Sequence, residues 1–288
     1  MRRIPRSALA LPLAFPLVFG CASTPAAPAA SRSAESASQG TRSLDGVLAG
    51  DWRTPEFTAR DAARHPKETL TFFGVRPDQT VIEITPGGGW YAEILAPYLQ
   101  ADGQYVAAVW DDSAPDARPY YAKLNQALRE KFASRPELFG QAKVVPFNTE
   151  APDFGAPGSA DVVLTFRNAH NWVKGGVADV YFRAFFDVLK PGGTLGVVDH
   201  RAKPGTTPEQ MAESGYVTED VIIGIAQAAG FELAGRSEVN ANPNDTASHP
   251  NGVWSLPPSN RHDPADAEKY RAIGESDRMT LRFVKPAN

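Results

Sequence analysis

The sequence predicts an α/β domain built on a doubly wound, mostly parallel seven-stranded sheet with helices on both faces. Short apolar, β-branched runs alternate with segments of helical periodicity from about residue 46 onward. A glycine-rich turn follows the first run, and a long irregular excursion separates the last two. With 288 residues, of which 42% are hydrophobic, the chain can bury one sizeable core.

The predicted strands are short runs rich in valine, isoleucine and aromatic residues. They cover residues 80–85, 105–110, 142–147, 161–166, 194–199, 231–239 and 279–284. The first five alternate with helical segments, which is typical of parallel strands joined by crossover helices. The last two flank residues 240–276, so we expect an antiparallel C-terminal strand pair at one sheet edge. A loop excursion of this length is a candidate lid.

The predicted helices fill the intervals between these strands. They cover residues 56–73, 90–99, 117–133, 177–189 and 217–229. Within the first of them, Pro66 is expected to start a second helical segment, because proline is favoured at the first helical position.

Residues 1–21 have the pattern of an export signal. Three arginines precede the apolar run 8–19, which is shorter than the ~20 residues that a bilayer-spanning helix needs. The run ends in Val18-Phe19-Gly20-Cys21, which resembles a bacterial lipobox, whose cysteine becomes the lipidated N-terminus. We therefore expect an exported lipoprotein that faces the periplasm. An ordinary signal peptide cleaved within residues 26–30, leaving a soluble periplasmic protein, is the alternative.

Residues 22–45 are mostly alanine, serine, proline and threonine, and they lack the apolar residues needed to fold. They are predicted to form a flexible tether that joins the anchor to a domain at 46–288. The net charge of −4 argues against a nucleic-acid partner. Cys21 is the only cysteine, which excludes a disulfide or a cysteine zinc cluster within one chain. The five histidines are scattered, so no metal site is predicted.

The strongest local motif runs from Val81 to Trp90 and predicts a strand, a tight turn and a helix. Its three consecutive glycines allow positive φ and close approach of a ligand to the backbone. The helix N-terminus behind them favours an anionic group, and Glu83 could point a carboxylate at the same place. Thr85 stands where a dinucleotide fingerprint has its first glycine, which counts against a nicotinamide enzyme.

Two motifs resemble those of class I S-adenosylmethionine (SAM)-dependent methyltransferases. Residues 83–89 resemble the first motif of that family, with Thr85 replacing its first glycine, and Leu189-Lys190-Pro191-Gly192-Gly193 resembles its turn before the fifth strand. A longer string, including Arg60-Asp61, residues 166–172 and Asp199-His200-Arg201, is similar to a bacterial group of exported, lipoprotein-like predicted methyltransferases. The resemblance implies a Rossmann-like methyltransferase fold over residues 46–288.

The resemblance also implies SAM as the cofactor and a role for each matching residue. Asp111 or Asp112, after the second predicted strand, would hold the ribose hydroxyls. Asn148 would meet the adenine amino group, or would instead cap its own turn. The residues that would cradle the methionine part are Glu83, Thr85, Gly87, Gly88 and Gly89.

Two histidines follow neighbouring strands of the predicted sheet. His170 comes after the fourth strand and His200 after the fifth, so both are candidates for a catalytic base. Arg167 could hold an acidic group of the substrate. Alternatively, the histidines bond only to loop backbone. His249 and His262, in the excursion, are expected at the surface.

The function predicted from these residues is SAM-dependent methyl transfer to an oxygen or nitrogen of a small molecule. One alternative is a non-catalytic exported binding protein that retains the fold, since SAM is made in the cytoplasm. A second alternative is an NAD(P)-dependent oxidoreductase, which would leave the motif at 189–193 without an explanation.

The lipobox makes a prediction about localisation. Palmitate labelling should mark the wild-type protein, and Cys21→Ser should release it from the membrane fraction, because the thioether-linked lipid is its only expected anchor. The variant should unfold at the wild-type temperature, since Cys21 precedes the tether. A wild-type protein that is already soluble in the periplasm would contradict lipidation and leave an ordinary signal peptide.

Overall fold

A computed structural model describes residues 42–114 and 117–287. The predicted signal, Cys21 and the tether up to residue 41 lie outside the described residues and stay predictions. Helix α1 (Leu44–Leu48) opens the described part, so the folded domain begins slightly before the predicted residue 46. The Ser43 hydroxyl caps α1 by accepting a hydrogen bond from the Gly46 N–H. Within these ranges no helix has the length and apolar character that crossing a bilayer requires.

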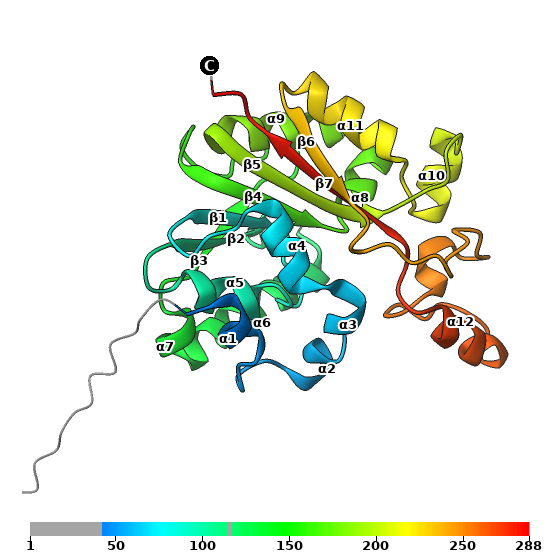
Figure 1. The fold of residues 1–288 in the computed structure, drawn as a ribbon, viewed down its shortest axis with the longest axis horizontal. Coiled ribbons are helices and arrows are strands. Elements are labelled where there is room, and N and C mark those ends of the chain that lie inside the picture. Colours follow the sequence, from blue (N-terminus) through cyan, green and yellow to red (C-terminus); the bar gives the residue numbers. More distant parts are fainter. Residues whose placement is uncertain (1–41, 115–116, 288) are drawn as a thin grey trace, which may run out of the picture. The chain divides into compact units, whose positions relative to one another are not determined.

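Seven strands form one sheet in the order β3-β2-β1-β4-β5-β7-β6 (Figure 1). The strands are β1 (Thr80–Ile84), β2 (Gln104–Trp110), β3 (Lys143–Phe147), β4 (Ala160–Phe166), β5 (Leu189–His200), β6 (Glu232–Ser237) and β7 (Arg278–Val284). Strands β1 to β5 pair in parallel, whereas β7 runs antiparallel to both β5 and β6. The predicted fold class, including the antiparallel C-terminal pair, is confirmed.

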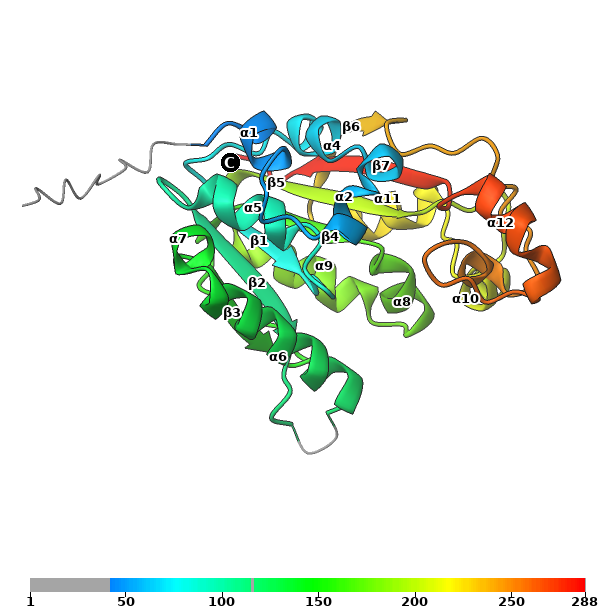
Figure 2. The same ribbon diagram turned by 90° about the horizontal axis from the view of Figure 1, so that it is seen from below.

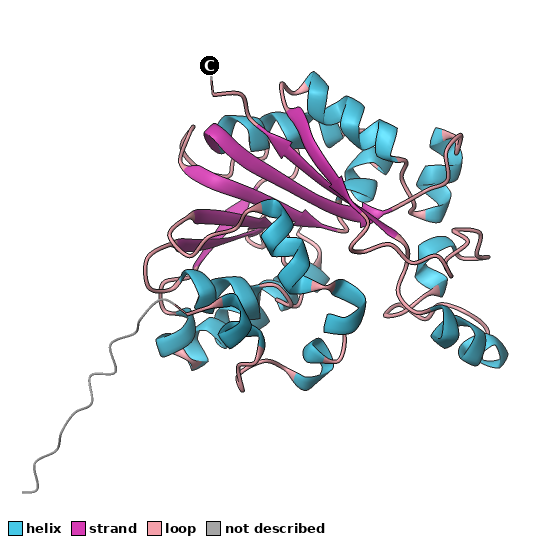
Figure 3. Cartoon of the chain, in the orientation of Figure 1, coloured by secondary structure: helices cyan, strands magenta, loops and turns pink. Residues whose placement is uncertain are grey.

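The helices connect these strands and are shorter at several places than predicted (Figure 3). The predicted helix 56–73 is three short helices, and Pro66 starts the last of them as expected. The helices are α2 (Pro55–Thr58), α3 (Asp61–Arg64), α4 (Pro66–Phe73), α5 (Ala92–Leu99), α6 (Pro119–Ser134), α7 (Pro136–Phe139), α8 (Ala169–Lys174), α9 (Ala178–Val188), α10 (Pro208–Ser214), α11 (Glu219–Ala228) and α12 (Ala267–Ile273).

The sheet is buried on both faces because successive strand residues point to opposite sides. In β1, Ile82 and Ile84 belong to a core with α8, α9 and α11, whereas Val81 belongs to a second core with α1, α4, α5 and α6 (Figure 2). Glu83 alternates with Ile82 and Ile84, so it lies on the same face as Val81. The carboxyl ends of the parallel strands are left as the open edge of this sandwich.

The motif at 189–193 is part of β5 rather than a turn that precedes it. Gly192 takes a φ of 78°, and its N–H donates to the Lys285 carbonyl at 2.8 Å. The Lys285 N–H in turn donates to the Gly193 carbonyl at 2.9 Å. The left-handed backbone of Gly192 therefore lets this segment pair with the chain just after β7, which extends the strand.

The excursion between β6 and β7 contains α12 and two 3-10 helices, η1 (Gly252–Ser255) and η2 (Pro264–Asp266). The expectation that its histidines lie at the surface is wrong for His249, whose side chain is 4% exposed. His249 Nε2 lies 2.8 Å from an Asp245 oxygen, and Asp245 also accepts hydrogen bonds from the Tyr216 hydroxyl and the Asp277 N–H. This buried network ties the first part of the excursion to the residue that precedes β7.

Candidate cofactor and active site

A cavity of about 470 Å³ lies at the carboxyl ends of β1, β4 and β5. This is the edge at which parallel α/β sheets bind ligands, and the volume is within the range typical of small-molecule pockets. Its lining includes the glycine turn, the loop after β4, the end of β5, helix α3 and part of the excursion. The lining residues include Arg60, Arg64, Glu83, Thr85, Gly87, Gly88, Tyr91, Phe166, Arg167, His170, His200, Trp254 and Pro258.

The glycine turn keeps a left-handed backbone even where threonine replaces glycine. Thr85 has a φ of 49°, which is uncommon for a β-branched residue, and its N–H donates to the Ala108 carbonyl at 2.8 Å. Its hydroxyl oxygen is buried and has no hydrogen-bond partner among the described residues. An unpaired polar atom on a cavity wall can bond to whatever occupies the cavity, a ligand or water.

The three glycines of the turn differ in what they face. Gly87 has a φ of 59°, and a Cβ built on it would meet no atom within 4 Å. Gly88 also lines the cavity. Gly89 does not line it: a Cβ there would lie 3.0 Å from Leu128 Cδ1 on α6. The structure thus assigns Gly89 to helix packing and leaves Gly87 and Gly88 for a ligand.

Glu83 is buried beneath the turn, and its carboxylate accepts a 2.6 Å hydrogen bond from the Tyr105 hydroxyl. Burial raises the pKa of Glu83 from 4.5 to about 7, an effect that the Tyr105 hydrogen bond and the charge of Arg64 oppose. Both protonation states are therefore accessible at neutral pH, and a cationic ligand would favour the ionised one.

The predicted ribose and adenine contacts lie away from this cavity. Asp111 and Asn148 line a neighbouring cavity of about 480 Å³, which shares Trp110 and Asn171 with the first. Asp111 accepts hydrogen bonds from the Ser113 N–H and hydroxyl. The Asn148 side-chain oxygen accepts hydrogen bonds from the N–H groups of residues 150 and 151. Asn148 therefore caps its own turn, as the alternative prediction stated.

Asp112 faces a different partner. Its carboxylate forms a two-point ion pair with Arg129 on α6, at 2.7 and 3.2 Å, and it is absent from the lining of both cavities. Of the two aspartates, only Asp111 lines either of these cavities.

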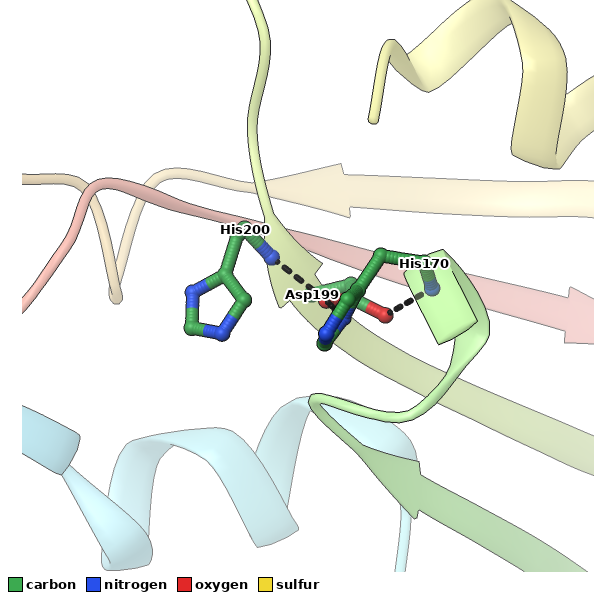
Figure 4. Close-up of side chains that lie close together, drawn as sticks. All are labelled: His170, Asp199 and His200. Atoms are coloured by element: carbon green, nitrogen blue, oxygen red, sulfur yellow. Dashed lines mark hydrogen bonds and ion pairs between the residues drawn. The ribbon is translucent and has the colours of Figure 1, made fainter. Parts of the chain in front are cut away.

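His170 and Asp199 form a hydrogen-bonded pair at the ends of β4 and β5 (Figure 4). His170 Nδ1 lies 2.8 Å from Asp199 Oδ1, and the His170 N–H donates to Oδ2 at 2.9 Å. The His200 N–H donates to Oδ1 at 2.7 Å. A carboxylate only accepts hydrogen bonds, so in this contact Nδ1 is the donor of a neutral imidazole, and Nε2 is then the nitrogen that carries the lone pair.

His200 lies beside this pair, with its ring centroid 5.0 Å from that of His170. Its Nδ1 lies 2.6 Å from the Ser276 hydroxyl. Burial is the main reason that the pKa of His200 lies well below its usual value, and the charges of His170 and three nearby arginines lower it further. His200 is therefore uncharged at neutral pH.

His170, Asp199 and His200 bring potential metal-ligand atoms within 4.8 Å of one another. Residue spacing did not reveal this group, because His170 lies in α8 and the other two residues lie about 30 positions later, at the end of β5. The Asp199 oxygens already receive the two N–H groups and His170 Nδ1. Arg64, Arg167 and Arg278 also act electrostatically on His200. These existing hydrogen bonds and the positive surroundings favour an acid–base role over a cation site.

Several residues that complete the cavity were not predicted from the sequence. Tyr91 and Phe166 stack with ring centroids 3.7 Å apart and form an apolar wall. Arg60 and Arg64 reach the cavity from the region of α3, and Arg64 lies over the Trp90 ring at 4.8 Å. The spacing of four between these arginines places them on one side of a helical segment, a signal that the sequence did contain.

No family model matches the chain, and no curated protein matches it in sequence. Among solved structures, a SAM-dependent methyltransferase from Aquifex aeolicus is 15% identical, with a TM-score of 0.53 over 84% of this chain and 98% of that one. A protein from Galdieria sulphuraria described as a sarcosine dimethylglycine methyltransferase is also 15% identical, with a TM-score of 0.53 over 80% and 87%.

The [4+2]-cyclase SpnF is 16% identical, with a TM-score of 0.55 over 83% of this chain and 86% of that one. At such identities the likeness shows the fold, and a cyclase among the neighbours shows that this fold does not dictate one reaction. The resemblance to class I methyltransferases is confirmed as a fold, whereas the exported group stays a prediction.

The raised pKa of Glu83 makes a prediction about stability. The neutral carboxyl stabilises the fold below pH 4.5, and this contribution is lost as the pH rises through about 7. At about 1.36 kcal/mol per pKa unit, the loss amounts to at most about 3 kcal/mol. The glutamine of Glu83→Gln cannot ionise, so this variant avoids the loss. Its stability relative to that of the wild type should therefore rise by up to that amount as the pH increases from 4.5 to 8.

Urea unfolding at both pH values measures this difference. Glu137→Gln is the control: a hydrogen bond from Arg135 lowers the pKa of this exposed carboxyl on α7, so the variant should not gain stability relative to wild type as the pH rises. Equal destabilisation by Glu83→Gln at pH 4.5 and pH 8 would show that Glu83 does not titrate in this range.

Proposed function

We propose that this protein is a SAM-dependent methyltransferase that acts on an oxygen or nitrogen nucleophile of a small molecule. The observation that carries the proposal is that His170, which is paired with Asp199, lines the same cavity as the glycine turn. A proton acceptor and a cofactor cradle thus face one small volume. The fold shared with SAM-dependent methyltransferases supports this interpretation.

The residues of the turn fit the methionine part of SAM. The Thr85 hydroxyl is unpaired, and the open space beside Gly87 allows a ligand to approach the backbone closely. A nearby ammonium group would favour the ionised form of the Glu83 carboxyl. SAM, when bound, supplies an electrophilic methyl group on a sulfonium. We further propose that Asp111 and the neighbouring cavity receive the nucleoside part.

His170 is the proposed general base. With Nδ1–H directed to Asp199, Nε2 can take the proton of a hydroxyl or amine nucleophile. Asp199 then holds the imidazole ring in place and stabilises the imidazolium that forms. His200 is uncharged and bonded to Ser276, so it can orient a substrate polar group without repelling the protonated His170.

Tyr91 and Phe166 form the wall against which a substrate packs, and Trp254 and Pro258 of the excursion line the cavity as well. These apolar groups exclude water from the reacting atoms and hold the two reactants in one orientation. Orientation of this kind supplies much of the rate of a bimolecular displacement.

The cofactor cradle is tested by Gly87→Val. Its side chain would project into the cavity, so we expect calorimetric titration to detect no SAM or S-adenosylhomocysteine binding. Gly158→Val is a matched control, because Gly158 also has a positive φ of 67°, has open space at its Cβ, and lies outside the cavity. Equal SAM affinity in both variants, or binding of NAD by the wild-type protein, would contradict the proposal.

The base is tested by His170→Ala, assayed as S-adenosylhomocysteine formed with a panel of small alcohols, phenols and amines. We expect kcat to fall by ~10²–10⁴ with little change in SAM affinity. The loss should shrink at high pH, where the acceptor deprotonates unaided.

His249→Ala is the control, since His249 forms a similar buried 2.8 Å pair with Asp245 but does not line the main cavity. If the two variants lose stability and turnover alike, the role of His170 is structural. Turnover that chelation abolishes and one added divalent metal restores would instead favour the metal interpretation of His170, Asp199 and His200.

A further inference from the structure

Four arginines surround one carboxylate beside the active-site cavity. Arg60 Nε lies 2.7 Å from Glu275 Oε1, while Arg64 Nε and Arg278 Nη1 lie 3.2 and 3.0 Å from Oε2. Arg167 completes the set through its charge, without an ion pair or side-chain hydrogen bond to a described residue. We call Arg60, Arg64, Arg167, Arg278 and Glu275 the arginine cluster.

The arginine cluster is far from neutral. Its single carboxylate leaves an excess of three positive charges if all four guanidinium groups are protonated. Two other acids act on its members: Asp199, which is bonded to His170, and Glu83, whose pKa burial raises to about 7. By contrast, neighbouring Arg53 is matched by its own partner, Asp61. The positive excess is thus particular to the cavity side.

Hydrogen-bond donors in the cluster are also left without acceptors. The Arg64 Nη2 and Arg278 Nε atoms are buried, and neither has a hydrogen-bond partner among the described residues. Arg60 Nη2, by contrast, lies 2.7 Å from Glu275 Oε1. Arg64 and Arg278 are 5% and 4% exposed, so water cannot freely reach them. Buried donors without acceptors are costly, and most native structures contain few.

The charges repel one another as well. Burial, and to a smaller extent the charge of Arg167, lowers the pKa of Arg64 to about 9. Burial, and to a smaller extent the charge of Arg278, lowers the pKa of Arg167 to about 10. A bound anion would oppose both effects, because it supplies the missing negative charge and the missing acceptor atoms.

The position of the cluster connects it to the reaction site. Arg60, Arg64 and Arg167 line the same cavity as His170 and Gly87. Arg64, Arg167 and Arg278 are close enough to depress the pKa of His200. A molecule held by these arginines would therefore have its remaining atoms near the proposed base.

We propose that the arginine cluster binds an oxyanion group of the methyl acceptor, so that the substrate is a small molecule carrying a phosphate or carboxylate. Planar guanidinium groups suit both because they donate two parallel hydrogen bonds to either group. This inference rests on the proposed methyltransferase function. The methionine part of SAM is a weaker match, because its carboxylate is balanced by its own ammonium group.

Anion binding by the full-length protein tests this inference. Inorganic phosphate and malonate are titrated separately, with sodium chloride at matched ionic strength as the screening control. The readouts are the thermal unfolding midpoint and calorimetric affinity, each with and without saturating S-adenosylhomocysteine. The variants are Arg167→Gln and, as control, Arg183→Gln, which removes an exposed arginine outside the cavity.

We expect phosphate or malonate, but not chloride, to raise the wild-type midpoint with saturation. The better of the two identifies the anion as phosphate or carboxylate. Arg167→Gln should weaken binding about 10- to 100-fold, as expected for lost charge-assisted hydrogen bonds, whereas Arg183→Gln should match wild type. Without anion, Arg167→Gln should be at least as stable as wild type, because one unpaired like charge is removed. A purely structural arginine would give the opposite sign.

S-adenosylhomocysteine separates this inference from the function on which it rests. Anion binding that persists beside bound S-adenosylhomocysteine supports an acceptor site. Anion binding that S-adenosylhomocysteine displaces would show that the cluster holds the carboxylate of the cofactor, which overturns the inference. No saturable binding of either anion also overturns it. If S-adenosylhomocysteine itself does not bind, the proposed function is contradicted, whether or not the anions bind.

Discussion

The site depends on the hydrogen bonds made to the Asp199 carboxylate, which is fully buried at the end of β5. This carboxylate receives the His170 and His200 N–H groups and His170 Nδ1. These contacts tie the loop after β4 to the end of β5 and set the tautomer and direction of the candidate base. Because Asp199 has no exposure, any change in its hydrogen bonding must move one of the two histidines.

Around this anchor, the open edge of the sheet collects groups that a folding protein would otherwise avoid. Thr85 keeps a left-handed backbone and an unpaired hydroxyl, Glu83 is a carboxyl with a raised pKa, and the arginine cluster buries like charges together. Backbone strain, unpaired polar atoms and buried like charges are unfavourable for folding, and here they gather at one cavity. Such a concentration is typical of a site shaped for ligands rather than for stability.

The fold could be predicted because its signals are local. Strand β1 follows from a β-branched run, and the order of strands and helices implied the parallel sheet. Helices α8, α10 and α12 were missed, since six or seven residues are too few for a reliable helical period. Gly89 was assigned to a ligand, although packing against Leu128 on α6 explains its lack of a side chain.

The sequence by itself determined that two histidines and a glycine turn follow strands of a parallel sheet, because strand ends can be located from local pattern. Only the tertiary structure decided that Asp199 orients His170, and that Arg60 reaches Glu275 across 215 positions. Hydrogen bonds and charge pairs act over a few ångströms in space, while residue spacing records distance along the chain. The sheet brings its strand ends together, and the chemistry of the cavity follows from that approach.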